Sequence, residues 1–128
     1  MKTTVLVVED NDDLALMLQM LISSEDDMTC VGKLANANAV LETVEAQHPN
    51  VVLMDLGMPG RNPLEVMREA TARFASTRFI ILSGYDDQGR VNEVIDHGAW
   101  GFVSKNGELP AILAAIRRVA RGEISLNR

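Results

Sequence analysis

Cysteines, basic residues and long apolar runs are scarce in this sequence. Its one cysteine, Cys30, excludes an internal disulfide, fits a reducing compartment and indicates a small core side chain. The 12 lysines and arginines are outnumbered by 18 acidic residues, and the net charge of -6 argues against direct nucleic-acid binding. No apolar stretch is long enough to span a membrane, and the N-terminus is too short for the charged region of a signal peptide. We therefore expect a soluble, cytoplasmic protein without membrane contact.

Short apolar runs alternate with stretches of helical periodicity along the whole chain. The runs predict five buried strands, at Thr4–Val8, Met28–Leu34, Val51–Met54, Phe79–Leu82 and Trp100–Val103. The intervening stretches predict five helices, which run from Asp12 or Asp13 to Ser23, from Asn38 to Gln47, from Pro63 to Phe74, from Asp86 or Asp87 to Gly98, and from Glu108 to Arg121. Such alternation is typical of an α/β protein with a parallel sheet and helices on both faces.

Polar and charged side chains follow four of these strands. They are Glu9, Asp10, Asp55, Ser83 and Lys105. Because parallel strands end at the same edge of a sheet, we expect these side chains to gather there. Three clustered carboxylates repel one another unless a cation lies between them, and oxygen ligands without His or Cys favour Mg²⁺. An aspartate beside a divalent cation and a lysine is equipped to attack a phosphoryl group, so the set predicts an aspartyl phosphate.

Four segments resemble the receiver domain of two-component response regulators in their content, order and separation. They are Val7–Asp10, Leu53–Gly60, Ile81–Gly84 and Gly98–Lys105. The resemblance covers nearly the whole chain and implies a flavodoxin-like (βα)5 doubly wound sheet, with five parallel strands in the order 2-1-3-4-5. It implies a phosphoacceptor receiver domain at residues 1–121, and residues 122–128 as a C-terminal tail or the start of a linker.

The resemblance also assigns roles around Asp55. This residue would accept a phosphoryl group from a sensor histidine kinase or a histidine phosphotransfer protein. Asp10, Asp55 and the backbone carbonyl of Gly57 would bind Mg²⁺, and Glu9 would act through water. Lys105 would pair first with the Asp55 carboxylate and then with the phosphoryl group. Such a domain is a signalling protein rather than an enzyme, since its only chemistry is its own phosphorylation and dephosphorylation.

Further residues would form the switch. Ser83 would move to hydrogen-bond a phosphoryl oxygen, and Phe102 would follow it inward, although many relatives have Tyr at that position. Gly57 and Tyr85 stand where the family tunes dephosphorylation. Asn62-Pro63 replaces the Asp-Gly that is common in the family, so the loop after Asp55 is expected to be stiffer than usual.

Two surface features suggest partners. Leu16, Met17 and Met20 lie off the core stripe of the first helix, on the helix that meets the phosphodonor in this family, although some of them could instead cover the edge of the core. Trp100 could cap the end of the sheet, but its small neighbours favour exposure on the face between the fourth helix and the fifth strand, which the family uses for output. The end of the chain resembles the junction to a helix-turn-helix domain, so the expected output is transcription, with phosphorylation-dependent homodimers as a possible form.

The sequence is also compatible with other functions. The receiver could be a stand-alone adaptor or a pseudo-receiver scaffold that is never phosphorylated. A phosphohydrolase with an aspartate nucleophile would need a second Asp at the position of Gly57, which argues against turnover. A flavodoxin-like nucleotide-binding protein would need a phosphate-binding loop after the first strand, where the acidic run Glu9–Asp13 would instead repel phosphate.

Overall fold

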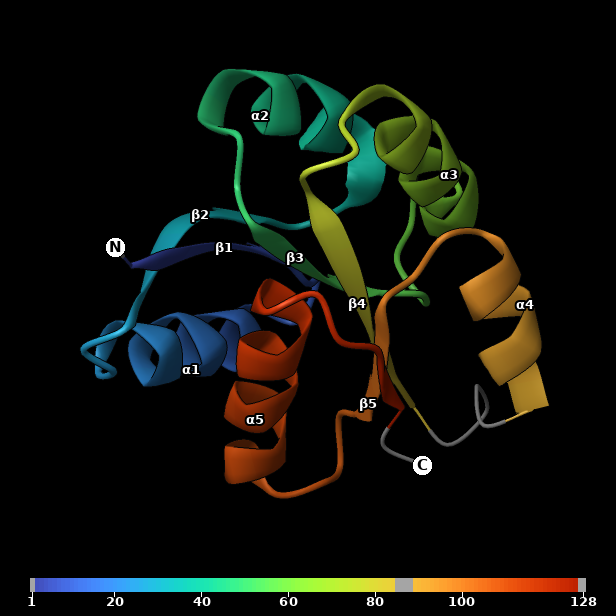
Figure 1. Ribbon diagram of the computed structural model, residues 1–128. Helices are drawn as coiled ribbons and strands as arrows, with labels where there is room; N and C mark the ends of the chain where they lie inside the picture. The colour runs from blue at the N-terminus through green and yellow to red at the C-terminus, as the bar shows by residue number, and fades with distance from the viewer. Residues whose placement is uncertain (1, 85–88, 127–128) are drawn as a thin grey trace.

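A parallel sheet lies between two layers of helices in the computed structural model, which describes residues 2–84 and 89–126 (Figure 1). The strands are β1 (Thr3–Val8), β2 (Met28–Leu34), β3 (Val51–Asp55), β4 (Arg78–Ser83), β5 (Gly101–Ser104) and β6 (Ser125–Leu126). The helices are α1 (Asp12–Ser23), α2 (Val40–Gln47), α3 (Pro63–Arg73), α4 (Val91–Asp96) and α5 (Leu109–Ala120), with a short 3-10 helix, η1 (Ala37–Ala39), before α2. In the part of the chain that is described, no helix has the length and apolar composition to cross a membrane.

The strand order is β2-β1-β3-β4-β5-β6, and every neighbouring pair is parallel. The α/β class and the predicted order of the first five strands are confirmed. A sixth strand was not predicted: Ser125 and Leu126, in the expected tail, pair with Gly101 and Phe102 of β5. Gly101 permits this close approach, because a Cβ there would lie 3.3 Å from the carbonyl oxygen of Ser125.

Each face of the sheet contributes to a separate core. Helices α1 and α5 cover one face, and α2, α3 and α4 cover the other (Figure 1). Along β1, Val5 and Val7 belong to the core under α1 and α5, whereas Leu6 and Val8 belong to the opposite core. Strand β3 is buried along its whole length, which explains why its sequence is a continuous apolar run rather than an alternating one.

Helix starts show where local sequence rules succeed and where they miss. Asn62 caps α3 as predicted, with its Oδ1 accepting from the Leu64 N–H at 3.0 Å. The prediction that Asp12 or Asp13 caps the first helix is wrong, since Asn11 is the cap and accepts from the Leu14 N–H at 3.0 Å. The two aspartates lie instead in the first turn, where carboxylates interact favourably with the helix dipole.

Other element boundaries and environments differ in detail from expectation. The second predicted helix begins as η1, and the expected start of the fourth, at Asp86 or Asp87, lies outside the described residues. Gly98 and Gly122 follow α4 and α5 with φ of 109° and 85°, the left-handed conformation expected after a helix. Cys30 is only half-buried, and burial raises the pKa of its thiol.

The expectation that Trp100 is exposed is wrong. The ring is partly buried against the core under α1 and α5. The guanidinium of Arg78, at the start of the neighbouring strand β4, lies over it at 4.6 Å from the ring centroid. Although the neighbours of Trp100 in the sequence are small, its ring is covered by Arg78 from another strand.

Candidate functional site

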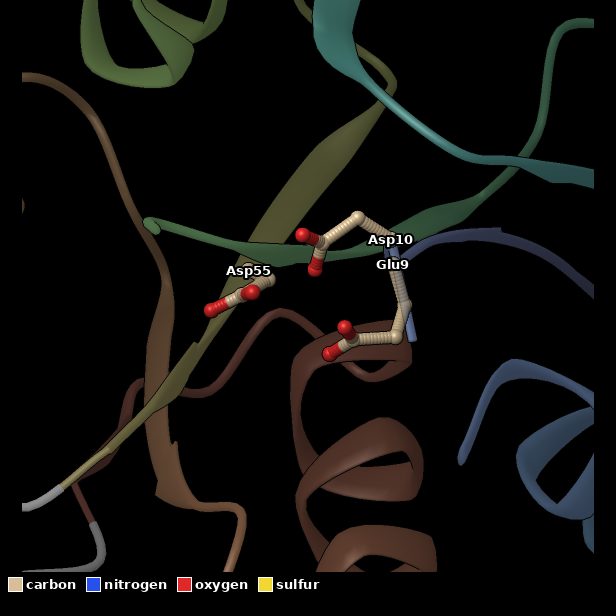
Figure 2. A group of neighbouring side chains, drawn as sticks. All are labelled: Glu9, Asp10 and Asp55. Carbon is tan, nitrogen blue, oxygen red and sulfur yellow. The ribbon is translucent and has the colours of Figure 1, made fainter. Parts of the chain in front are cut away.

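Strands β1 and β3 bring three carboxyl groups to one edge of the sheet. Val8 of β1 pairs with Met54 of β3. The residues that come next, Glu9 and Asp55, therefore lie together at the carboxyl ends of these adjacent strands. Oxygen atoms of Glu9, Asp10 and Asp55 lie within 4.8 Å of one another (Figure 2). The sequence-based expectation that these residues gather at one edge agrees with this arrangement.

Lys105 joins this cluster from the end of β5. Its Nζ lies 3.1 Å from Asp55 Oδ2 and 3.2 Å from Glu9 Oε1. The backbone holds the lysine at this position, because its N–H donates to the Ser83 carbonyl at 2.8 Å. Burial lowers the pKa of Lys105, but its hydrogen bond to Asp55 and the charges of Asp55 and Glu9 outweigh burial, and the pKa is raised.

Glu9 is the most deeply buried acid of the cluster. Its Oε2 accepts from the Asn11 N–H at 2.9 Å, but its buried Oε1 has no hydrogen-bond partner, although Lys105 Nζ is nearby. Burial raises the pKa of Glu9, and Asp10 and Asp55 act in the same direction, against the Asn11 hydrogen bond and the Lys105 charge. Lys105 offsets only part of the negative charge of the three acids, so this edge could accept a further cation.

Asp55 is buried at the end of β3, whereas Asp10 is exposed. Asp55 Oδ1 accepts from the Gly57 N–H at 3.3 Å, and its other oxygen faces Lys105. The three acids offer only carboxylate oxygens, and the Asp10 group is open to solvent. These three residues could therefore hold a metal ion, and an all-oxygen donor set suits a hard divalent cation.

Ser83 lies on β4, the strand next to β3, and Phe102 lies on β5, one strand further along the sheet. Ser83 ends β4 one residue beyond Leu82, the register partner of Asp55, and its Oγ donates to the Val103 carbonyl at 3.2 Å. Phe102 is fully buried in the core under α2, α3 and α4. Tyr85, which was expected to tune dephosphorylation, lies outside the described residues.

Three predicted surface residues are exposed on α1. The exposed fractions of Leu16, Met17 and Met20 are 48%, 41% and 64%. Together with Asp13, Leu21 and Leu109 they line a mostly apolar groove of about 410 Å³ between α1 and the start of α5. Trp100 does not line this groove. Of the four residues expected to form a partner surface, only the three on α1 are exposed.

Some supports of the site were missed from the sequence. The Asn11 N–H that binds Glu9 comes from the residue that also caps α1, and the Leu34 carbonyl accepts from the Glu9 N–H at 2.9 Å. Asn38 accepts from the Arg61 N–H at 2.9 Å, across 23 residues. Polar residues near a strand end give a weak signal for Asn11, but nothing in the sequence links Asn38 to the loop after Asp55.

Comparison with known proteins relates the whole chain to one family. The family model described as the response regulator receiver domain matches residues 5–117. The nitrate/nitrite response regulator protein NarL of Escherichia coli K12 is 32% identical over 124 residues, which are 97% of this chain and 57% of NarL. The oxygen regulatory protein NreC of Staphylococcus carnosus is 29% identical over 124 residues, with 96% and 57% covered. The chain thus spans little more than half the length of these relatives.

Solved structures share the fold over the full length of the domain. The signal receiver domain of NarL from Mycobacterium tuberculosis superposes with a TM-score of 0.88 at 27% identity, covering 95% of this chain and 98% of that one. The response regulator domain of Thermotoga maritima CheB gives a TM-score of 0.84 at 28% identity, with 94% and 98% covered.

Proposed function

The chain belongs to the response regulator receiver domain family, and from this premise we propose that it is a phosphorylation-switched signalling domain with Asp55 as its phosphoacceptor. Members of this family are signalling proteins rather than enzymes. The observation that carries the proposal is the ion-pair cluster at the strand ends, where Lys105 lies between Asp55 and Glu9 at 3.1 and 3.2 Å. A buried carboxylate beside a lysine and two further acids is suited to take up a phosphoryl group.

The proposed transfer is a single displacement at phosphorus. A carboxylate oxygen of Asp55 attacks the phosphorus of a phosphohistidine, and the new O–P bond forms as the P–N bond breaks. The electron pair of that bond leaves with the imidazole, and the product is an aspartyl phosphate. Lys105 can follow the charge from the carboxylate to the phosphoryl oxygens, because its ammonium group already contacts Asp55.

The acidic cluster fits a role in binding Mg²⁺. In this proposal Asp10, Asp55 and the Gly57 carbonyl hold the ion, and Glu9 acts through a water molecule. The oxygen-only donor set, and the three acids that share the single charge of Lys105, support this assignment. When bound, Mg²⁺ would supply positive charge that stabilises the oxygens of the transferring phosphoryl group.

Ser83 and Phe102 form the proposed switch. The Ser83 hydroxyl, now donating to the Val103 carbonyl, would exchange this bond for one to a phosphoryl oxygen. Phe102, on the strand that carries Lys105, would transmit the change to the face formed by α4 and β5. Gly57 and Tyr85 remain proposed sites for tuning the lifetime of the phosphoryl group.

We assign the phosphodonor to a histidine kinase or a histidine phosphotransfer protein. The groove that contains Leu16, Met17 and Met20 is the proposed surface for its helices, because it is apolar and adjoins Asp13 at the start of α1. The name of DegU of Brevibacillus brevis, a transcriptional regulatory protein that is 27% identical over 121 residues, supports transcription as the output. Phosphorylation-dependent homodimers and a cytoplasmic location remain predictions.

A mass measurement tests the phosphoacceptor. The protein is incubated with Mg²⁺ and acetyl phosphate, and its intact mass is measured with and without the donor. We expect an adduct of about 80 Da, the mass of one phosphoryl group, that is absent in Asp55→Asn. The matched control, Asp26→Asn, changes an exposed aspartate far from this edge and should keep the adduct. No adduct under conditions that modify a known receiver would favour the pseudo-receiver alternative instead.

A further inference from the structure

The loop that follows Asp55 carries part of the proposed cation site on its backbone. Gly57 donates its N–H to Asp55 Oδ1, and its carbonyl is a proposed donor to Mg²⁺. Leu56 and Met58 anchor the start of the loop, since both are buried in the core under α2, α3 and α4. The loop ends at Asn62, the cap of α3.

Asn38 holds the far part of this loop from another segment. Its Oδ1 accepts from the Arg61 N–H at 2.9 Å. The same oxygen lies so close to Gly60 that a Cβ at that position would approach it to 2.7 Å. Gly60 also has a φ of 93°, which disfavours any other residue there. Two successive residues of the loop are thus fitted closely around one side-chain oxygen.

The segment that carries Asn38 supports both halves of the site. Asn36 accepts from the Asn38 N–H at 2.9 Å and so orders η1, whose Ala37 is fully buried. A few residues earlier, the Leu34 carbonyl accepts from the Glu9 N–H. Residues 34–38 therefore bind the backbone of an acid of the cluster at one end and the loop after Asp55 at the other.

We propose that Asn38 is a positioning residue for the cation site. It holds the loop after Asp55 in the conformation that directs the Gly57 carbonyl to the acids, an inference that rests on the proposed function. An amide suits this task, because its oxygen accepts a backbone hydrogen bond without adding charge to an edge with three carboxylates. Without Asn38 the loop would have to become ordered when the cation binds, and this ordering would weaken binding.

Titration with Mg²⁺ alone tests the inference. Asn38→Ala removes one backbone hydrogen bond, and we expect its affinity for Mg²⁺ to fall about fivefold. The Arg61 amide should exchange its hydrogen faster than in the wild type. Phosphorylation by acetyl phosphate should slow by the same factor at limiting Mg²⁺ and recover at saturating Mg²⁺, since the defect lies in binding.

Three variants separate positioning from a general loss of structure. Asn38→Asp keeps the acceptor oxygen and should restore protection of the Arg61 amide. Gly60→Ala keeps Asn38 but pushes the loop away from it, and it should weaken Mg²⁺ binding as Asn38→Ala does. Asn50→Ala is the matched control, because Asn50 Oδ1 accepts from the Thr4 N–H at 2.8 Å at the opposite edge of the sheet. It should bind Mg²⁺ like the wild type.

The possible failures are distinguishable. If Asn38→Ala binds Mg²⁺ as tightly as the wild type, the positioning role is overturned while the proposed function stands. If Asn38→Ala is equally slow at limiting and at saturating Mg²⁺, its role is only structural, and the inference is again overturned. If the wild type neither binds Mg²⁺ nor takes a phosphoryl group on Asp55, the proposed function fails and the inference fails with it.

Discussion

Replacing Lys105 with methionine would remove the cation that lies between two buried carboxylates. The Glu9 and Asp55 side chains are 0% and 6% exposed, and the Lys105 side chain is 22% exposed. Breaking a fully buried ion pair costs about 3–5 kcal/mol, and an exposed pair is worth about 0–1 kcal/mol. Because the lysine is partly solvated, we place the loss for Lys105→Met between these limits, at about 2 kcal/mol.

Thermal unfolding in the presence of EDTA measures this loss. For a domain of this size, about 2 kcal/mol corresponds to a fall of about 8 °C in Tm. The pKa of Lys105 is raised in the folded protein, so its contribution is complete below its ordinary pKa of about 10.4 and is lost only as the pH rises through the folded value. The full effect should therefore be present at neutral pH.

Two comparisons complete the measurement. Lys33→Met removes an exposed lysine from β2 and should shift Tm by no more than about 2 °C, as surface substitutions usually do. Saturating Mg²⁺ should narrow the gap between Lys105→Met and the wild type, because a bound cation also neutralises the acids. A Lys105→Met protein as stable as the wild type in EDTA would refute the view that this lysine offsets the buried negative charge.

Three further predictions concern the cation, the surface and a helix cap. Asp10→Ala should weaken Mg²⁺ binding at least tenfold, and an unchanged calorimetric titration would exclude Asp10 as a ligand. Arg117 lowers the pKa of Asp27 by hydrogen bonds of 2.8 and 3.0 Å, so their stabilisation exists above the ordinary Asp pKa of about 4 and is lost as the pH falls through the lower folded value. Arg117→Ala should therefore lower the urea midpoint at neutral pH but much less in acid, and an equal loss at both would contradict this. Asn62→Ala removes the cap on the Leu64 N–H and should cost about 1 kcal/mol in urea unfolding, whereas no change would show that the cap is redundant.

The regular part of the fold could be predicted because its signals are local. An unbroken apolar run indicates strand β3, and the Asn62-Pro63 pair indicates the start of α3. Strand β6 has no such signal, since it is two residues long and forms only because β5 has a free edge and Gly101 allows close approach. The cover over Trp100 was missed for a similar reason, because Arg78 is 22 residues away in the sequence.

The central residues of the candidate site could also be predicted from the sequence. The rule that parallel strands end at one edge brings Asp55, Glu9 and Lys105 together without any knowledge of side-chain geometry. The same rule says nothing of the residues that hold them. The burial of the Glu9 carboxylate depends on side-chain packing, and the contact of Asn38 with the Arg61 N–H joins η1 to the loop after Asp55, whose approach is set by the packing of α2 and α3.

The Arg78–Trp100 pair gives the protein an intrinsic fluorescent probe. Trp100 is the one tryptophan of the sequence, so all indole fluorescence comes from a single site. That site precedes β5, about 16 Å along the chain from Lys105 at the extended spacing of about 3.3 Å per residue. A shift of β5 that changed the stacking of Arg78 on the ring would alter the emission. The response of the strand to events at Asp55 could thus be followed in real time without a label.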